Sequence, residues 1–181
     1  MLNIKGTKTE KNLHTALEGE ALARVKYEIF ASQAKKDGYV QLSEIFKESS
    51  DNEKEHAKIW FKLLHDGGVK PTLDNLEEAI SSEESEWSEM YNNFAAEAKE
   101  EGFYDIAKLF ELTAAIEREH ERRYKIFTNN IRENRVFKSS EEIIWKCGNC
   151  GHFHYGKEAP ETCPMCNHPK SYFRKLNVFY G

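Results

Sequence analysis

The sequence predicts a mainly α-helical chain, in which four long helices form a bundle and a small β-rich domain follows. Apolar residues recur at helical spacing in four stretches of the first part of the chain. All four cysteines lie between Cys147 and Cys166, and three of the four prolines and four of the ten glycines follow residue 140. This change of composition predicts two domains, residues 1–138 and residues 139–181.

Composition limits the class of protein. The 181 residues are 39% hydrophobic and 31% charged, which suits one full-sized core with a charged surface. The N-terminal residues lack an apolar signal core, and no run approaches the roughly 18 apolar residues of a membrane helix. A net charge of −5 argues against nucleic acid or an anionic membrane as the main partner. We therefore expect a cytoplasmic protein with neither partner.

The predicted helices follow the apolar stripes in order, over residues 13–34, 42–63, 80–98 and 106–127. Gly38 and Gly102 separate the members of each pair, as C-cap glycines do in tight antiparallel hairpins. The segment D-G-G-V-K-P-T-L-D-N-L, residues 66–76, is expected to form one longer crossover. Two helical hairpins joined by one crossover form the ferritin-like type of four-helix bundle.

The two predicted hairpins are copies of each other. Shifting the sequence by 64 residues places Tyr27 on Tyr91 and Gly38 on Gly102, and it superimposes the motifs E-K-E-H and E-R-E-H. The chain therefore contains an internal duplication. We expect each hairpin to offer the same chemistry to a shared centre.

Charged residues interrupt the apolar stripes where core leucines would be expected. Glu53 and His56 do so in the second helix, and Glu117 and His120 do so at the equivalent places in the fourth. Burying several carboxylates is costly unless they are protonated or meet cations. Glu-x-x-His on two helices, with a Glu on each of the other two, is the pattern of di-iron and di-manganese bundles. The candidate carboxylates are Glu20, Glu53, Glu83, Glu86 and Glu117. The alternative is a metal-free bundle with polar core layers.

The third helix leaves its ligands open, because S-E-E-S-E-W offers three carboxylates. The 64-residue repeat pairs Glu20 with Glu84, whereas stacking on one helix face favours Glu83 with Glu86. A local bulge in this helix would reconcile the two interpretations.

The cysteines form two Cys-x-x-Cys pairs separated by twelve residues: Cys147, Cys150, Cys163 and Cys166. Four thiolates at this spacing predict one tetrahedral metal site, and a cytosolic chain makes structural disulfides the poorer interpretation. The spacing does not distinguish iron from zinc, and the motif alone favours zinc. We expect five aromatic residues to pack a small core of short strands around the site: Trp145, Phe153, Tyr155, Tyr172 and Phe173.

The chain resembles the rubrerythrin family over essentially its whole length. The resemblance is carried by seven segments: E-G-E-A-L-A-R-V-K-Y (18–27), E-K-E-H (53–56), E-S-E-W-S-E-M-Y (84–91), F-A-x-x-A-K-E-E-G-F (94–103), E-R-E-H (117–120), C-x-x-C-G (147–151) and A-P-E-T-C-P-M-C-N-H-P (159–169). It implies a di-iron centre in a ferritin-like bundle, and a rubredoxin-like iron on the four cysteines in place of zinc.

The resemblance also implies the ligands and their roles. The family's seven positions fall on Glu20, Glu53, His56, Glu83, Glu86, Glu117 and His120. By the same resemblance Glu53 and Glu117 bridge the irons, and Glu83 and His120 hold one of them. Glu20 holds the other, on which Glu86 and His56 exchange as the oxidation state changes.

The implied activity is that of a peroxidase in oxidative-stress defence, which reduces hydrogen peroxide to water with electrons returned through the cysteine-bound iron. The implied partners are a redox-protein donor, namely rubredoxin or an NAD(P)H-dependent reductase, and a second copy in a homodimer. The phenols of Tyr27 and Tyr91 can hydrogen-bond a ligand carboxylate or peroxide, or they are ordinary core tyrosines. The alternative functions are a ferroxidase or iron-handling protein, and a zinc-ribbon binding module.

Overall fold

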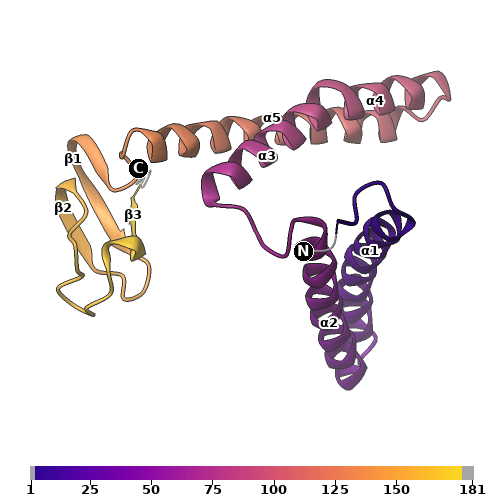
Figure 1. Ribbon diagram of the computed structural model, residues 1–181, viewed down its shortest axis with the longest axis horizontal. Coiled ribbons are helices and arrows are strands. Elements are labelled where there is room, and N and C mark those ends of the chain that lie inside the picture. Colours follow the sequence, from indigo (N-terminus) through magenta and orange to yellow (C-terminus); the bar gives the residue numbers. More distant parts are fainter. Residues whose placement is uncertain (1–2, 177–181) are drawn as a thin grey trace. The chain divides into compact units, whose positions relative to one another are not determined.

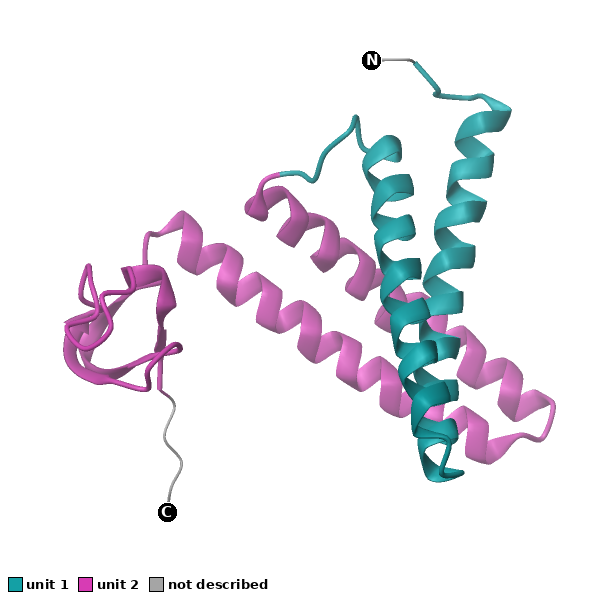
Figure 2. Ribbon diagram, turned by 90° about the horizontal axis from the view of Figure 1, so that it is seen from below, with its two compact units in different colours: residues 1–70 teal, residues 71–181 magenta. Residues whose placement is uncertain are grey.

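The computed structural model describes residues 3–176, which divide into two compact units, residues 1–70 and 71–181 (Figures 1 and 2). The helical segments are α1 (Lys8–Lys36), α2 (Val40–Leu64), α3 (Thr72–Ser85), the π-helix η1 (Glu86–Met90), α4 (Tyr91–Glu100) and α5 (Tyr104–Arg132). The strands are β1 (Lys138–Cys147), β2 (Phe153–Glu158) and β3 (Phe173–Lys175), with a short 3₁₀ helix η2 (Lys170–Tyr172) before the last. Within residues 3–176, no helix is both long and apolar enough to cross a membrane.

The first unit is an antiparallel hairpin of α1 and α2. Thr7 caps α1 by accepting a hydrogen bond from the Glu10 backbone N–H at 3.1 Å, which satisfies one of the free N–H groups of the first turn. At the other end the chain turns through Gly38, whose φ of +86° is the left-handed conformation that glycine adopts without strain. The Tyr39 N–H then bonds the Ala34 carbonyl at 2.8 Å, so the turn expected at Gly38 is present.

Small residues form the interface inside each hairpin. In the first unit the Ser43 hydroxyl donates to the Ala31 carbonyl at 2.7 Å, so the two helices approach closely. In the second unit Ala95 and Ala107 occupy the equivalent places and are fully buried. The buried small residues of the two interfaces are Ala31, Ala34, Ser43 and Ser50, and Ala95, Ala98, Ala107 and Ala114. Each set is the other shifted by 64 residues, so the duplication extends to the packing.

The second unit begins with a longer helix than the sequence predicts. The expected crossover of residues 66–76 ends early, because α3 starts at Thr72. Pro71, with φ of −55°, precedes the helix, and its carbonyl accepts the Asn75 N–H at 3.1 Å. Proline suits a helix start since it has no N–H to leave unpaired, and Asp74 in the first turn complements the helix dipole.

The bulge expected in the third helix is present as the π-helix η1, residues Glu86–Met90. In the first hairpin Glu20 and Tyr27 are seven residues apart, whereas Glu83 and Tyr91 are eight apart in the second. A π-turn accommodates one additional residue without ending the helix. The 64-residue repeat therefore holds from Tyr91 onwards, and a 63-residue repeat holds before η1.

The C-terminal sheet is antiparallel with strand order β2-β1-β3. Trp145 and Phe173 are buried in its core, and the Trp145 indole donates to the Gly156 carbonyl at 3.0 Å. The prediction of a core of five aromatic residues is wrong, since three of them are exposed: Phe153, Tyr155 and Tyr172. The sheet is too small to bury both faces, so Cys147 and Cys163 complete the core instead. Residues 133–137 connect the end of α5 to the start of β1. The domain boundary between residues 138 and 139 stays a prediction.

Candidate metal centres

The first cluster of candidate ligands lies in the hairpin of α1 and α2. Glu20 comes from α1, and Glu53 and His56 come from one face of α2 because they are three residues apart. The His56 Nδ1 atom lies 2.9 Å from a Glu53 carboxylate oxygen and 3.7 Å from one of Glu20. The ligand atoms of the three residues all lie within 4.8 Å of one another.

The second cluster repeats this arrangement in the second unit. Glu83 comes from α3, and Glu117 and His120 come from α5. The His120 Nδ1 atom lies 2.7 Å from Glu117 and 3.7 Å from Glu83, close to the corresponding distances in the first cluster. Partial burial raises the pKa of Glu83, and the hydrogen bond and charge of Glu117 raise it further. Two carboxylates held this close favour a cation between them.

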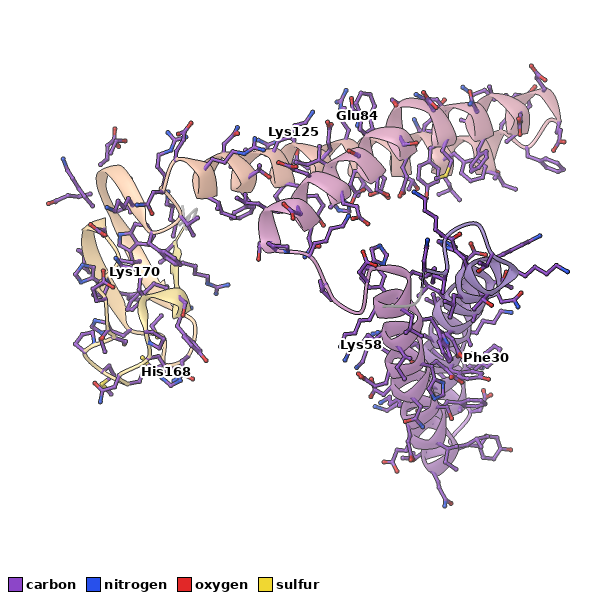
Figure 3. All side chains as sticks on the ribbon, in the orientation of Figure 1. Phe30, Lys58, Glu84, Lys125, His168 and Lys170 are labelled. Atoms are coloured by element: carbon purple, nitrogen blue, oxygen red, sulfur yellow. The ribbon has the colours of Figure 1, made fainter. Side chains whose placement is uncertain are left out.

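The structure separates the three carboxylates of the third helix. Glu83 belongs to the cluster, whereas Glu84 is exposed and its charge helps to raise the pKa of Lys125 after the larger effect of Glu121 (Figure 3). Glu86 is half-buried at the start of η1 and accepts a hydrogen bond from the Ser82 hydroxyl at 3.3 Å. This arrangement agrees with the choice of Glu83 over Glu84, although the ligand assignments stay predictions.

The two candidate tyrosines occupy equivalent, half-buried places. The ring of Tyr27 lies 6.1 Å from that of Phe46, and the ring of Tyr91 lies 6.1 Å from that of Phe110. Burial raises the pKa of Tyr91, and the charge of Glu86 raises it further. The Tyr91 phenol is therefore a proton-bearing group beside the second cluster.

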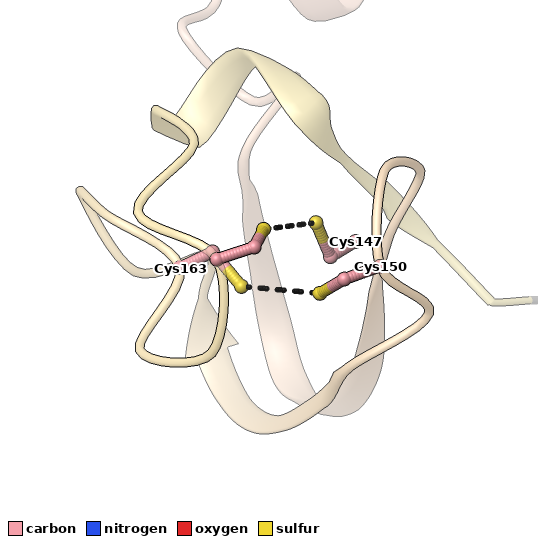
Figure 4. A group of neighbouring side chains, drawn as sticks. Cys147, Cys150 and Cys163 are labelled. Atoms are coloured by element: carbon pink, nitrogen blue, oxygen red, sulfur yellow. Dashed lines mark hydrogen bonds between the residues drawn. The ribbon is translucent and has the colours of Figure 1, made fainter.

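The four cysteines form one cluster of free thiols in the C-terminal sheet domain (Figure 4). The Sγ atoms of Cys147 and Cys166 are 3.8 Å apart, and those of Cys150 and Cys163 are 3.7 Å apart, too far for disulfides. Both Cys-x-x-Cys turns have the same backbone form. The Gly151 N–H donates to the Cys147 carbonyl at 3.0 Å, and the Asn167 N–H donates to the Cys163 carbonyl at 2.9 Å.

Two of the thiols have pKa values that move in opposite directions. The backbone N–H of His168 lowers the pKa of Cys166 to about 6, whereas the pKa of Cys150 is raised to about 12. At Cys150 the N–H of His152 acts in the lowering direction, but desolvation and the hydrogen bonds of the other three thiols outweigh it. Four thiols this close ionise together only when a cation neutralises them. The residues present therefore fit a four-thiolate metal, as the carboxylates and imidazoles of the helical clusters fit harder metal ions.

Comparison with known proteins matches the chain over nearly its full length. The family model described as rubrerythrin matches residues 11–73 and 74–147, and that of the rubrerythrin rubredoxin-like domain matches residues 145–174. The chain belongs to the rubrerythrin family. Rubrerythrin of Nitratidesulfovibrio vulgaris is 44% identical, with 98% of this chain and 99% of that protein covered. Rubrerythrin-1 of Clostridium acetobutylicum is 43% identical, with 99% and 100% covered.

A solved structure titled "Fully reduced state of nigerythrin (all ferrous)" is 30% identical and covers 97% of this chain and 92% of that one, with a TM-score of 0.34. Membership of the rubrerythrin family confirms the predicted mainly α, ferritin-like class with a rubredoxin-like domain. Rubrerythrins have a di-iron site and a four-cysteine site, which agrees with the predicted cofactors of two iron ions and one further iron.

One buried carboxylate beside the second cluster was not among the predicted residues. Glu121 is only 5% exposed and accepts a hydrogen bond from the Trp87 indole at 3.0 Å. The signal was its spacing, since Glu117, Glu121 and Tyr124 follow one helical stripe. The many neighbouring charges of E-R-E-H-E-R-R made it look like part of a solvated face.

Proposed function

We propose that the protein is a non-haem di-iron peroxidase that reduces hydrogen peroxide to water in oxidative-stress defence. The observation that carries the proposal is the occurrence, in one chain, of two matching Glu–Glu–His clusters and a four-thiol cluster. The two kinds of site have different chemistry, because oxygen-rich ligands suit a centre that meets oxygen substrates, and thiolates suit an electron-transfer iron. Membership of the rubrerythrin family supports the same combination.

The proposed iron ligands are the six residues of the two helical clusters together with Glu86. Glu53 and Glu117 are the proposed bridging ligands, and Glu86 and His56 are the pair proposed to exchange. His56 suits exchange since its side chain is 51% exposed, whereas the equivalent His120 is 34% exposed. Bound iron would supply the electrons that cleave the O–O bond of peroxide.

The protein groups must manage protons as well as electrons, because one peroxide consumes two electrons and two protons to give two waters. Tyr91 keeps its proton because burial raises the pKa of the phenol, so it can donate a hydrogen bond to a ligand carboxylate or to peroxide. Tyr27 occupies the equivalent place in the first unit and is assigned the same role. Glu86 is the proposed catalytic carboxylate, since its charge acts directly on the Tyr91 phenol.

The four cysteines are proposed to hold the iron that returns electrons one at a time. Cys150 is exposed, so a redox donor can approach the cluster from its side. The proposed donor is rubredoxin or an NAD(P)H-dependent reductase, and the proposed assembly is a cytoplasmic homodimer. These partners follow from the family resemblance.

Two other functions predict different outcomes for the same protein. A ferroxidase or iron-handling protein would use the helical clusters but would react with oxygen and accumulate a mineral. A zinc-ribbon binding module would use the helices as a scaffold, and the purified protein would be colourless. The four-thiol cluster disfavours the first, and the paired Glu–Glu–His clusters disfavour the second.

The deciding experiment combines anaerobic metal analysis with a peroxide titration followed in visible light. We expect three irons in each chain, an iron–thiolate absorption, and reoxidation of both kinds of centre by peroxide after anaerobic reduction. A control titration with oxygen should react more slowly. Absence of the iron–thiolate absorption, or no response to peroxide, would overturn the proposal.

A further inference from the structure

The π-helix η1 is held by side chains as well as by its backbone. Asn92, the second residue of α4, donates from its side-chain amide to the Trp87 carbonyl at 3.0 Å and to the Ser88 carbonyl at 3.2 Å. A π-turn displaces backbone carbonyls from the i to i+4 pattern, and unpaired carbonyls are costly. The Asn92 amide therefore supplies donors where the altered helix needs them.

A second contact ties η1 to α5. The Trp87 indole donates to a Glu121 carboxylate oxygen at 3.0 Å, and Lys125 forms an ion pair with the same carboxylate (Figure 3 labels Lys125). Glu121 is the one buried charged residue among residues 3–176. A buried carboxylate is tolerated only when it is paired and hydrogen-bonded, so both partners are needed to keep it there.

Residues 3–70, the described part of the first unit, have no equivalent of the Trp87–Glu121 contact. Ala57 lies 64 residues before Glu121, and Ala23 and Arg24 lie 64 and 63 residues before Trp87, so neither the carboxylate nor the indole has a counterpart there. There α1 continues as regular helix from Lys8 to Lys36. The contacts therefore occur in the second unit, which also contains the one additional residue and Glu86.

We propose that Glu121, Trp87 and Asn92 are positioning residues that hold the π-turn in register and so keep Glu86 beside the second metal cluster. Glu86 directly precedes Trp87, and its carboxylate accepts a hydrogen bond at 3.3 Å from the hydroxyl of Ser82, the residue before Glu83. A rotation of the turn would carry Glu86 away from this place. The inference rests on the proposed role of Glu86. It adds three residues that touch neither metal nor peroxide.

The test uses the iron-loaded protein and three variants with one matched control. Glu121→Ala and Trp87→Phe each remove the indole contact, while Glu121→Gln retains an oxygen that accepts it. The control is Glu119→Ala, which removes an exposed carboxylate of the same helical turn that pairs with Arg122. Hydrogen exchange of backbone amides in residues 83–92 and the absorption spectrum of the bound iron are measured for each.

We expect amides of residues 86–92 to exchange about tenfold faster in Glu121→Ala and Trp87→Phe, because a hydrogen bond to a charged group is lost. The iron spectrum should change in both, and it should return to that of the unaltered protein in Glu121→Gln. Glu119→Ala should match the unaltered protein. Unchanged exchange and unchanged spectra in the first two variants would overturn the inference.

A further variant keeps the inference testable if Glu121→Ala fails to fold. Asn92→Ala leaves the buried carboxylate intact, and we expect the same increase in exchange, confined to residues 86–92. Failure of the unaltered protein to react with peroxide would contradict the proposed function and leave the exchange comparison intact. The two outcomes are therefore distinguishable.

Discussion

Three carboxylates within four residues of the third helix have three different environments. Glu83 lies in the second cluster of candidate metal ligands, Glu84 is exposed near Lys125, and Glu86 begins the π-helix, where its carbonyl accepts the Tyr91 N–H. Residue type alone does not assign these roles, because the three side chains are chemically identical. The backbone that carries them makes the difference, since Glu83 and Glu84 face different directions on the α-helix α3 and Glu86 begins the π-turn.

The proposed ligands should therefore differ in their effects on metal binding. We expect Glu86→Ala to retain iron but to lower the rate of peroxide reduction by at least about tenfold, because an exchangeable ligand is removed. Glu53→Ala and Glu117→Ala should lose iron, since each removes a proposed bridge. Iron content by metal analysis and single-turnover peroxide kinetics separate the two effects. Equal iron loss in all three variants would leave the exchange of Glu86 unsupported.

At the scale of elements, small residues form the interface between the two helices of each hairpin, so these helices pack close together. Ala107 is fully buried against α4, so a larger side chain there would force the helices apart. We expect Ala107→Leu to lower the free energy of unfolding by about 1–3 kcal/mol, as overpacking does. Denaturant unfolding measures the change. Ala96→Leu on the exposed side of α4 is the control, and a similar loss there would contradict this explanation.

The π-helix predicts the result of a deletion. Removing Ser88 would restore the seven-residue spacing found in α1, and it would turn the residues before it by about 100° relative to those after it. We expect helix content by circular dichroism to be unchanged, and iron binding by the second cluster to be lost. Ser88→Ala should retain both. A deletion variant that keeps its full iron content would show that the ligand positions do not depend on the π-turn.

Sequence periodicity is sufficient to predict the two helical hairpins and the bulge in the third helix, because the spacing of repeated residues depends directly on helix geometry. It did not find the start of α3, since proline and glycine in D-G-G-V-K-P suggested a longer loop than the helix that Pro71 begins. It also overestimated the aromatic core of the small sheet. Burial there depends on which strand face is covered, and Tyr155 faces solvent although it lies on β2.

The whole molecule combines two kinds of centre on separate parts of the chain. The helical clusters lie within residues 20–120, and the thiols lie within residues 147–166. Each cluster is built by its own local elements, so the loss of one kind of site should leave the other intact. The proposed peroxidase needs both, because one kind of centre reduces peroxide and the other restores the electrons.

A cysteine variant tests this division of labour. We expect Cys163→Ser to lose the iron–thiolate absorption and to retain iron in the helical clusters, since a buried hydroxyl is a poor substitute for a thiolate. A single turnover with peroxide should proceed at the unaltered rate after chemical reduction, whereas steady-state turnover with a protein donor should fall by at least about tenfold. Ser171→Ala, in the same small domain, is the control. Undiminished steady-state turnover would show that electrons reach the helical clusters by another route.

The spacing of eight positions between Glu83 and Tyr91, against seven between Glu20 and Tyr27, also bears on the history of the chain. Two identical halves produced by gene duplication would surround a pair of metal ions with identical ligands. A single-codon difference between the halves ends that equivalence, because Glu86 then has only Leu22 or Ala23 as its counterpart. The two proposed metal positions thereby become distinguishable, because only the second unit carries a carboxylate at the start of a π-turn.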